Sequence, residues 1–343
     1  MISEVRATDR RGLAEVDALL AREGIRRDRN LDYTCVMYDD DYHAIATGSC
    51  FGNTLRCFAV SSDHQGEGLL NEIVTHLMSV QAARGNFRLF LYTKPDAAKF
   101  FADLGFHEIA RVENTLVFME NRRDGFSEYL RKLSEARRPG NSAAVVMNAN
   151  PFTLGHLYLV ETASAACDTL HLFMVSEDAS LVPYSVRARL IREGTAHLRN
   201  VVLHESGPYI VSAATFPSYF LRDETAVIEG QAKLDLQVFV KIASALDIRT
   251  RYVGEEPTSQ VTGLYNQIMK EALPKAGIAC VEIPRKEYGG AAISASTVRQ
   301  AVQRGDFDAL KALVPETTYR YFTSEEAAPI VGRIRRASDV VHY

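Results

Sequence analysis

Short apolar runs separated by polar turns dominate the first third of the chain. Leu13, Val16, Leu19 and Leu20 recur at helical spacing and predict an amphipathic helix within residues 1–25. The elements predicted next are strands at 33–38, 44–50 and 55–60, a helix from the turn 65–68 to about 81, a strand at 87–92, a helix at 96–104 and a strand at 116–119. The tight polar turns between the first three strands favour an antiparallel meander, and hence an α+β domain.

A charged stretch from about residue 121 to 141 ends in Pro139-Gly140 and interrupts this pattern. It is typical of a solvated connecting helix followed by a domain boundary. A solvated helix face explains its basic residues more simply than a nucleic-acid patch. We therefore expect an N-terminal domain at 1–125, a connecting helix or linker at 126–140 and a second domain at 141–343.

Beyond residue 140 the pattern changes to alternating strands and helices. Strands are expected at 143–147, 169–175, 201–204, 248–253 and 278–283, and helices at 155–167, 185–198, 234–246 and 261–273. The first strand is a continuous apolar run, as in a buried parallel strand. This alternation predicts a doubly wound, Rossmann-like α/β domain, with further helices in the tail after residue 294.

Composition narrows the function classes. The chain has 343 residues, of which 47% are hydrophobic, and a net charge of −4. Ordinary globular composition and a pI of about 6.2 give no bulk attraction to nucleic acid or membrane. We find no membrane-length apolar run and no signal peptide at the start. Five scattered cysteines favour neither a disulfide framework nor a zinc site, so we expect a cytoplasmic protein.

The segment 148–156 leaves the first strand of the second domain and enters a helix. Helix N-termini at the carboxyl end of a parallel sheet suit phosphate. Thr153 and His156 share one helix face, Gly155 permits close approach of a ligand, and an imidazole can donate to a phosphate oxygen. An N-cap and an ordinary helix histidine would explain the same residues. The candidates here are Thr153 and His156 for catalysis, and Asn150, Pro151, Phe152 and Gly155 for nucleotide binding.

A second cluster, at residues 293–299, combines hydroxyls with a guanidinium where a helix should begin. Ser294 and Ser296 are candidates for binding phosphate, and Arg299 for catalysis. A serine N-cap with an exposed arginine would also explain the pattern.

The two clusters together resemble the nucleotidyltransferase superfamily, which carries (H/T)-x-G-H and I-S-(S/T)-(S/T)-x-x-R motifs that contact ATP phosphates. Thr153 stands where that family often has its first histidine, and Ala295 replaces one usual hydroxyl. More specifically, the strings 147–156, 214–221, 253–257, 265–270 and 293–299 resemble the citrate (pro-3S)-lyase ligase family, over nearly the whole chain.

This resemblance implies a reaction. The family joins acetate to the thiol of the phosphoribosyl-dephospho-CoA group on the acyl carrier subunit of citrate lyase, through acetyl-AMP, and splits ATP to AMP and diphosphate. His156 and Arg299 would offset developing charge, with Mg²⁺ bridging the phosphates. Further candidates are Arg187 for the triphosphate, Glu255 and Glu256 for metal or ribose, and Ser212, Thr215 and Ser218 for nucleotide contact. A solvated helix arginine, capping and turn chemistry explain them equally.

The turn Gln65-Gly66-Glu67-Gly68 resembles the acetyl-CoA loop of the GNAT acyltransferases, (Q/R)-x-x-G-x-(G/A), although its spacing is tighter. Residues 100–106 resemble a later segment of that family. The resemblance implies that Gln65, Gly66 and Gly68 bind CoA or acetyl-CoA through backbone amides at a helix N-terminus. Two roles for this domain stay open. His64 or Glu67 could act as a catalytic base, or the domain could bind the CoA-like arm of the carrier protein.

Three other functions compete with an acetate ligase. One is an adenylyltransferase that makes a dinucleotide or CoA precursor. Another is a GNAT acetyltransferase whose second domain senses nucleotide, and the third is a non-catalytic assembly factor of a lyase complex.

Overall fold

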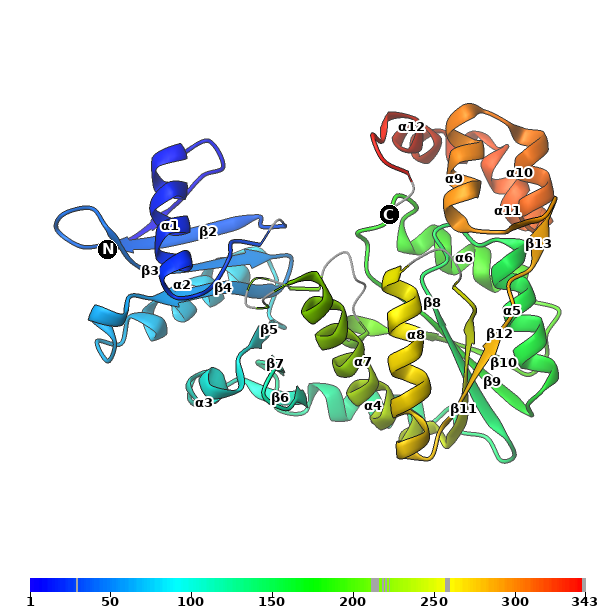
Figure 1. Ribbon diagram of the computed structural model, residues 1–343, viewed down its shortest axis with the longest axis horizontal. Coiled ribbons are helices and arrows are strands. Elements are labelled where there is room, and N and C mark those ends of the chain that lie inside the picture. The colour runs from blue at the N-terminus through cyan, green and yellow to red at the C-terminus, as the bar shows by residue number, and fades with distance from the viewer. Residues whose placement is uncertain are drawn as a thin grey trace. The chain divides into compact units, whose positions relative to one another are not determined.

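The protein divides into two compact units (Figure 1). The computed structural model describes residues 1–28, 30–210, 216, 217, 219, 221, 223–256 and 260–340. The N-terminal unit comprises Met1–Tyr129 with Phe216–Gln237, and the C-terminal unit comprises Leu130–Thr215 with Val238–Tyr343. A segment from the second half of the sequence thus belongs to the first unit.

One mixed sheet organises the described part of the N-terminal unit, with strand order β1-β2-β3-β4-β5-β7-β6. Its elements are β1 (Ile2–Glu4), α1 (Arg10–Arg22), β2 (Tyr33–Tyr38), β3 (Ala44–Phe51), β4 (Thr54–Val60), α2 (Leu69–Ala83), β5 (Phe90–Thr93), α3 (Ala98–Asp103), β6 (His107–Val112), β7 (Leu116–Glu120) and the start of α4 (Gly125–Ser134). The predicted meander is confirmed by β2, β3 and β4, which pair antiparallel. The sequence analysis missed β1 and β6, the two edge strands.

β4 and β5 pair in parallel over only two positions, Thr54 with Phe90 and Leu55 with Leu91. Tyr219, from the late segment, packs in a cluster with Cys57 of β4, and its hydroxyl donates a 2.6 Å hydrogen bond to the Tyr92 carbonyl of β5. Burial raises the pKa of Tyr219 well above its ordinary value, so the hydroxyl remains a donor. Tyr219 therefore joins the late segment to the core of the N-terminal unit.

A parallel sheet with strand order β10-β9-β8-β11-β12 forms the centre of the C-terminal unit. Its strands are β8 (Ser142–Met147), β9 (Thr169–Met174), β10 (Val201–Glu205), β11 (Ile248–Gly254) and β12 (Ala279–Ile283). The chain builds outward from β8 in both directions, which confirms the doubly wound fold. The order reverses between β8 and β11, and ligands bind at such switch points.

Helices surround this sheet (Figure 1). They are α5 (Leu154–Ala165), α6 (Tyr184–Gly194), α7 (Glu224–Leu246), which begins in the N-terminal unit, α8 (Gln260–Ala272), α9 (Ala295–Arg304), α10 (Phe307–Leu313), α11 (Glu316–Phe322) and α12 (Ala328–Arg336), with the hairpin β13 (Glu287–Tyr288) and β14 (Ala291–Ala292) before α9. Buried side chains of β8, β9, α5, α6, α9 and α12 share one core. No helix in the described ranges is long and apolar enough to span a membrane.

Two buried histidines lie side by side on β9 and β10. His171 Nδ1 and His204 Nε2 are 2.9 Å apart, and the two side chains are shielded from solvent. Burial lowers the pKa of each ring to about 4. In the same direction, the charge of Arg138 acts on His171, and His171 acts on His204. Both rings are therefore neutral at pH 7, and the hydrogen bond needs one donor and one acceptor.

This pair predicts acid sensitivity of the C-terminal unit. The unfolded chain takes up protons on these histidines near pH 6.5 and the folded chain only near pH 4, so their contribution to stability is full above pH 6.5 and falls as pH drops toward 4. Denaturant unfolding of the wild type and of His204→Gln at several pH values measures the two slopes. Between pH 4 and 6.5 we expect the free energy of unfolding of the variant to change less steeply with pH than that of the wild type. The difference should be about 1.4 kcal/mol per pH unit, which corresponds to about one proton fewer taken up on unfolding. Equal slopes would contradict the assignment of this acid sensitivity to the pair.

Candidate active site

The loop between β8 and α5 has a backbone shape that ordinary turns do not have. Ala149 has a positive φ of 47°, and the Asn150–Pro151 peptide bond is cis. Thr153 then caps α5, because its hydroxyl accepts a 3.2 Å hydrogen bond from the backbone N–H of His156. The predicted N-cap is thus present, and His156 completes it from the other side.

His156 folds back onto its own helix N-terminus. Its Nδ1 accepts from the Thr153 backbone N–H at 3.1 Å and lies 2.9 Å from the Thr153 hydroxyl oxygen. Because a backbone N–H can only donate, Nδ1 is unprotonated and the ring proton is on Nε2. Phe152 lies under the ring, nearly parallel to it at 14°, with the two centroids 6.0 Å apart.

Burial, and then the positive charges of Arg285 and Arg299, lower the pKa of His156 to about 4. The imidazole is therefore neutral at physiological pH and presents Nε2–H as a hydrogen-bond donor. A neutral donor can stabilise a growing negative charge without first attracting a counter-ion.

The two sequence motifs, far apart along the chain, meet at Gly155. A Cβ atom on Gly155 would lie 2.9 Å from the carbonyl oxygen of Ile293, which is closer than real Cβ contacts. Only glycine leaves room for this approach. The fold therefore places the N-terminus of α5 against the start of the segment 293–299.

Three hydroxyls gather at the N-terminus of α9. Ser294 caps the helix by accepting from the Thr297 backbone N–H at 3.1 Å, and its oxygen lies 2.8 Å from the Ser296 hydroxyl and 2.7 Å from that of Thr297. Sequence reasoning singled out the two serines and missed Thr297, although it lies within the same motif.

Arg299 is buried, unlike an arginine that binds phosphate on an open surface. Its Nε donates to the Val340 carbonyl at 2.6 Å, and Nη1 donates to the Asn150 carbonyl at 2.5 Å. Burial lowers its pKa to about 10, so it remains charged. The guanidinium joins the loop after β8 to the C-terminal tail.

Arg187 is also buried and also holds carbonyl oxygens. Its Nη1 donates to the backbone oxygen of Asn148 at 2.8 Å and to that of Val175 at 2.9 Å, while Nε donates to the Val182 carbonyl at 3.0 Å. These acceptors follow β8 and β9, so the guanidinium fastens together the ends of two neighbouring strands. Asn150 adds to this framework, because its Oδ1 accepts from the Val182 backbone N–H at 3.0 Å.

Arg285 is a charged residue of this region that sequence reasoning missed. It follows β12, donates from Nε to the Glu255 carbonyl at 2.7 Å and forms an ion pair with Glu256. The sequence offered a signal for this residue, because the basic string Pro284-Arg285-Lys286 directly follows the last parallel strand. Glu256, a candidate for metal or ribose, is thus engaged by an arginine.

The remaining candidates lie elsewhere. Gly66 and Gly68 have positive φ angles of 88° and 81° in the turn that precedes α2, and Gln65 begins that turn. Ser212, Thr215 and Ser218 lie outside the described residues. In the ranges that the structure describes, no group of three or more His, Cys, Asp or Glu residues could hold a metal ion by itself.

Comparisons with known proteins agree with the motifs. The family model for the citrate lyase ligase C-terminal domain matches residues 142–322. A citrate (pro-3S)-lyase ligase of Klebsiella pneumoniae is 42% identical over 283 residues, or 81% of this chain and 83% of that protein. One from Escherichia coli K12 is 36% identical over 328 residues, or 94% of this chain and 93% of that protein.

Two solved structures are similar at low identity. Thermotoga maritima TmcAL bound with alpha-thio ATP is 16% identical with a TM-score of 0.37, covering 55% of this chain and 57% of that one. A GNAT-family acetyltransferase of Staphylococcus aureus is 12% identical with a TM-score of 0.31, covering 35% of this chain and 98% of that one. On the family model and the two sequence relatives, the chain belongs to the citrate (pro-3S)-lyase ligase family.

Proposed function

We propose that this enzyme uses ATP and acetate to acetylate the thiol of the phosphoribosyl-dephospho-CoA group on the acyl carrier subunit of citrate lyase. The observation that carries the proposal is the neutral imidazole of His156, whose Nε2–H is available at the N-terminus of α5 beside the motif of residues 293–299. Family membership supports a ligase over an adenylyltransferase of small nucleotides or a nucleotide-sensing acetyltransferase.

The first step joins an acetate oxygen to the α-phosphorus of ATP and breaks the bond to the β-phosphate, so acetyl-AMP forms and diphosphate leaves. Negative charge grows on phosphate oxygens, where His156 Nε2–H, the hydroxyls of Ser294 and Ser296, and the amides at the start of α5 would donate. In the second step the carrier sulfur bonds to the acetyl carbon, the bond to AMP breaks, and the thiol proton passes to solvent.

The residues around His156 are assigned positioning roles. Thr153 fixes the ring and its tautomer, and Gly155 lets the Ile293 carbonyl, and with it the start of α9, approach α5. Arg187 holds the Asn148 carbonyl and Arg299 the Asn150 carbonyl, and together they keep the loop that leads to Pro151 and Phe152 in shape. This assignment gives Arg299 and Arg187 a structural contribution in place of direct contact with phosphate.

Mg²⁺ fits this site only together with ATP. Since the described residues offer no acidic cluster, the phosphate oxygens would provide most of its ligands, as is usual for this ion. Bound in this way, it would neutralise charge on the leaving diphosphate. The proposal extends to a cytoplasmic location and to the N-terminal turn of Gln65, Gly66 and Gly68 as a contact for the CoA-derived arm of the carrier.

The first half-reaction provides the direct test. Acetate-dependent exchange of labelled diphosphate into ATP needs no carrier protein. We expect exchange in the wild type and a loss of about 10²–10³-fold in His156→Ala, the usual effect of removing one oxyanion donor. His197→Ala is the matched control, because His197 is exposed in the same unit and, among the residues that the structure describes, pairs only with Glu161. Exchange supported by nicotinamide mononucleotide or phosphopantetheine, and not by acetate, would contradict the proposal.

A second test uses the contact between the two motifs. In Gly155→Ala the new Cβ would press on the Ile293 carbonyl and displace α9 from α5. We expect the KM for ATP in the exchange reaction to rise about tenfold or more, with the free energy of unfolding lowered by about 1–3 kcal/mol. Gly263→Ala is the control, since its Cβ would meet its nearest neighbour at an ordinary 3.7 Å. Identical kinetics in both variants would show that the motifs do not act together.

A further inference from the structure

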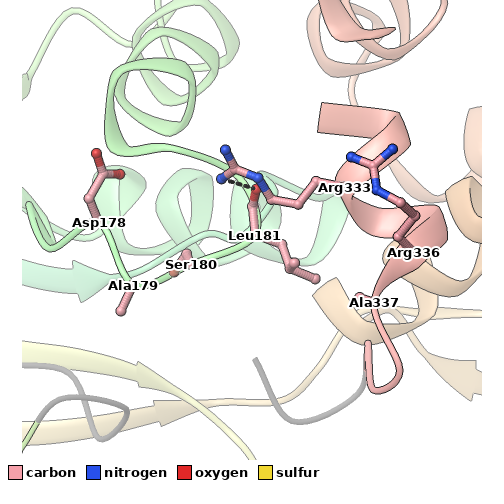
Figure 2. Close-up of a pocket in the computed structure, with 7 residues that line it drawn as sticks. All are labelled: Asp178, Ala179, Ser180, Leu181, Arg333, Arg336 and Ala337. Carbon is pink, nitrogen blue, oxygen red and sulfur yellow. Dashed lines mark hydrogen bonds between the residues drawn. The ribbon is translucent and has the colours of Figure 1, made fainter. Parts of the chain in front are cut away.

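A cavity of about 370 Å³ lies beside the C-terminal end of α12, and its lining residues have no role in the reaction proposed above. Residues 178–181 form one wall, and Arg333, Arg336 and Ala337 form the other. Figure 2 shows Arg333 reaching from α12 to the loop, where its Nη1 donates a 3.4 Å hydrogen bond to the Leu181 carbonyl. The cavity is largely open to solvent.

The loop that forms the first wall also contacts the loop after β8. The Ser180 hydroxyl accepts from Asn148 Nδ2 at 3.1 Å, and the Val182 backbone N–H donates to Asn150 Oδ1 at 3.0 Å. The loop therefore has the proposed ATP motif on one side and the cavity on the other. Neither His156 nor the hydroxyls at the start of α9 line the cavity.

The cavity carries a net positive charge. Two guanidinium groups line it against one carboxylate, Asp178, which accepts a 2.5 Å hydrogen bond from the Tyr184 backbone N–H. Within the part of the chain that the structure describes, Arg336 has no carboxylate partner and Arg333 bonds only to a carbonyl. Guanidinium groups bind phosphate through paired hydrogen bonds.

We infer that this cavity binds a phosphate group of the thiol acceptor, and that Arg333 and Arg336 are the residues that recognise it. The inference rests on the proposed function, in which the acceptor thiol belongs to a phosphate-bearing CoA derivative. The ATP phosphates are assigned to α5 and α9, so a second anion site next to the same loop suits the second substrate. The arginines then contribute to binding of the acceptor and not to formation of the adenylate.

The same turn of α12 offers a matched control. Arg335 has the same charge and lies in the same last turn of α12, but it does not line the cavity and its guanidinium lies near Gly305. All three arginines lie where a positive charge complements the negative end of the helix dipole. A difference between Arg335 and the other two therefore reports on the cavity and not on helix stability.

The test compares binding of dephospho-CoA, pantetheine and ATP by titration calorimetry in the wild type, in Arg333→Ala/Arg336→Ala and in Arg335→Ala. Pantetheine has the thiol arm without phosphate. We expect wild type to bind dephospho-CoA more tightly than pantetheine. The double variant should weaken dephospho-CoA binding about tenfold or more and remove that preference, while Arg335→Ala should leave it unchanged.

Several outcomes would overturn the inference. They are equal binding of dephospho-CoA and pantetheine by the wild type, no effect of the double variant on dephospho-CoA, and weakening of ATP instead, which would assign the cavity to the nucleotide. Acetate-dependent exchange is measured on the same variants and should be unchanged. If the wild type shows no acetate-dependent exchange, the proposed function is contradicted. If the wild type shows exchange and the double variant does not, the separation of the two sites is contradicted.

Discussion

The geometry of the site depends on two buried guanidinium groups that hold the backbone between β8 and α5. Arg187 binds the carbonyl of Asn148, and Arg299 binds the carbonyl of Asn150. Between these two points the chain adopts the left-handed conformation of Ala149, and the Asn150–Pro151 bond that follows is cis. Because a carbonyl on each side of Ala149 is bound by a buried guanidinium, the two contacts fix the path of the chain from the end of β8 toward α5.

Burying these cations costs desolvation energy, and the hydrogen bonds to carbonyl oxygens offset it. Carbonyls are neutral acceptors with two lone pairs each, and a planar guanidinium can donate to several of them at once. Lysine would present a single ammonium and could not span the Val340 and Asn150 carbonyls that Arg299 joins. This explains why an arginine is found at position 299 even though its positive charge adds to the effect of burial in lowering the pKa of the neighbouring His156. The same lowering keeps the imidazole neutral, which the proposed chemistry needs.

Local patterns predicted the α/β fold, the succession of strands and helices along the second domain and the helix cap at Thr153. They could do so because alternation, apolar runs and capping are properties of consecutive residues. They could not predict what Arg299 contacts, since its partners Asn150 and Val340 are set by tertiary folding. The insertion of Tyr219 into the N-terminal unit was beyond reach for the same reason. The edge strand β6 was missed because an irregularity between Glu108 and Ala110 places two consecutive buried residues, Ile109 and Ala110, where a strand would alternate.

Tyr219 also supports the sheet of the N-terminal unit where it is least well paired. β4 and β5 pair at only two positions, so the sheet gains little backbone hydrogen bonding there. Tyr219 packs beside Cys57 of β4 and donates to the Tyr92 carbonyl of β5, so one side chain contacts both strands. Because this hydroxyl is buried, the loss of its hydrogen bond to Tyr92 would be costly. The sheet of the N-terminal unit therefore depends on a segment from the second half of the sequence.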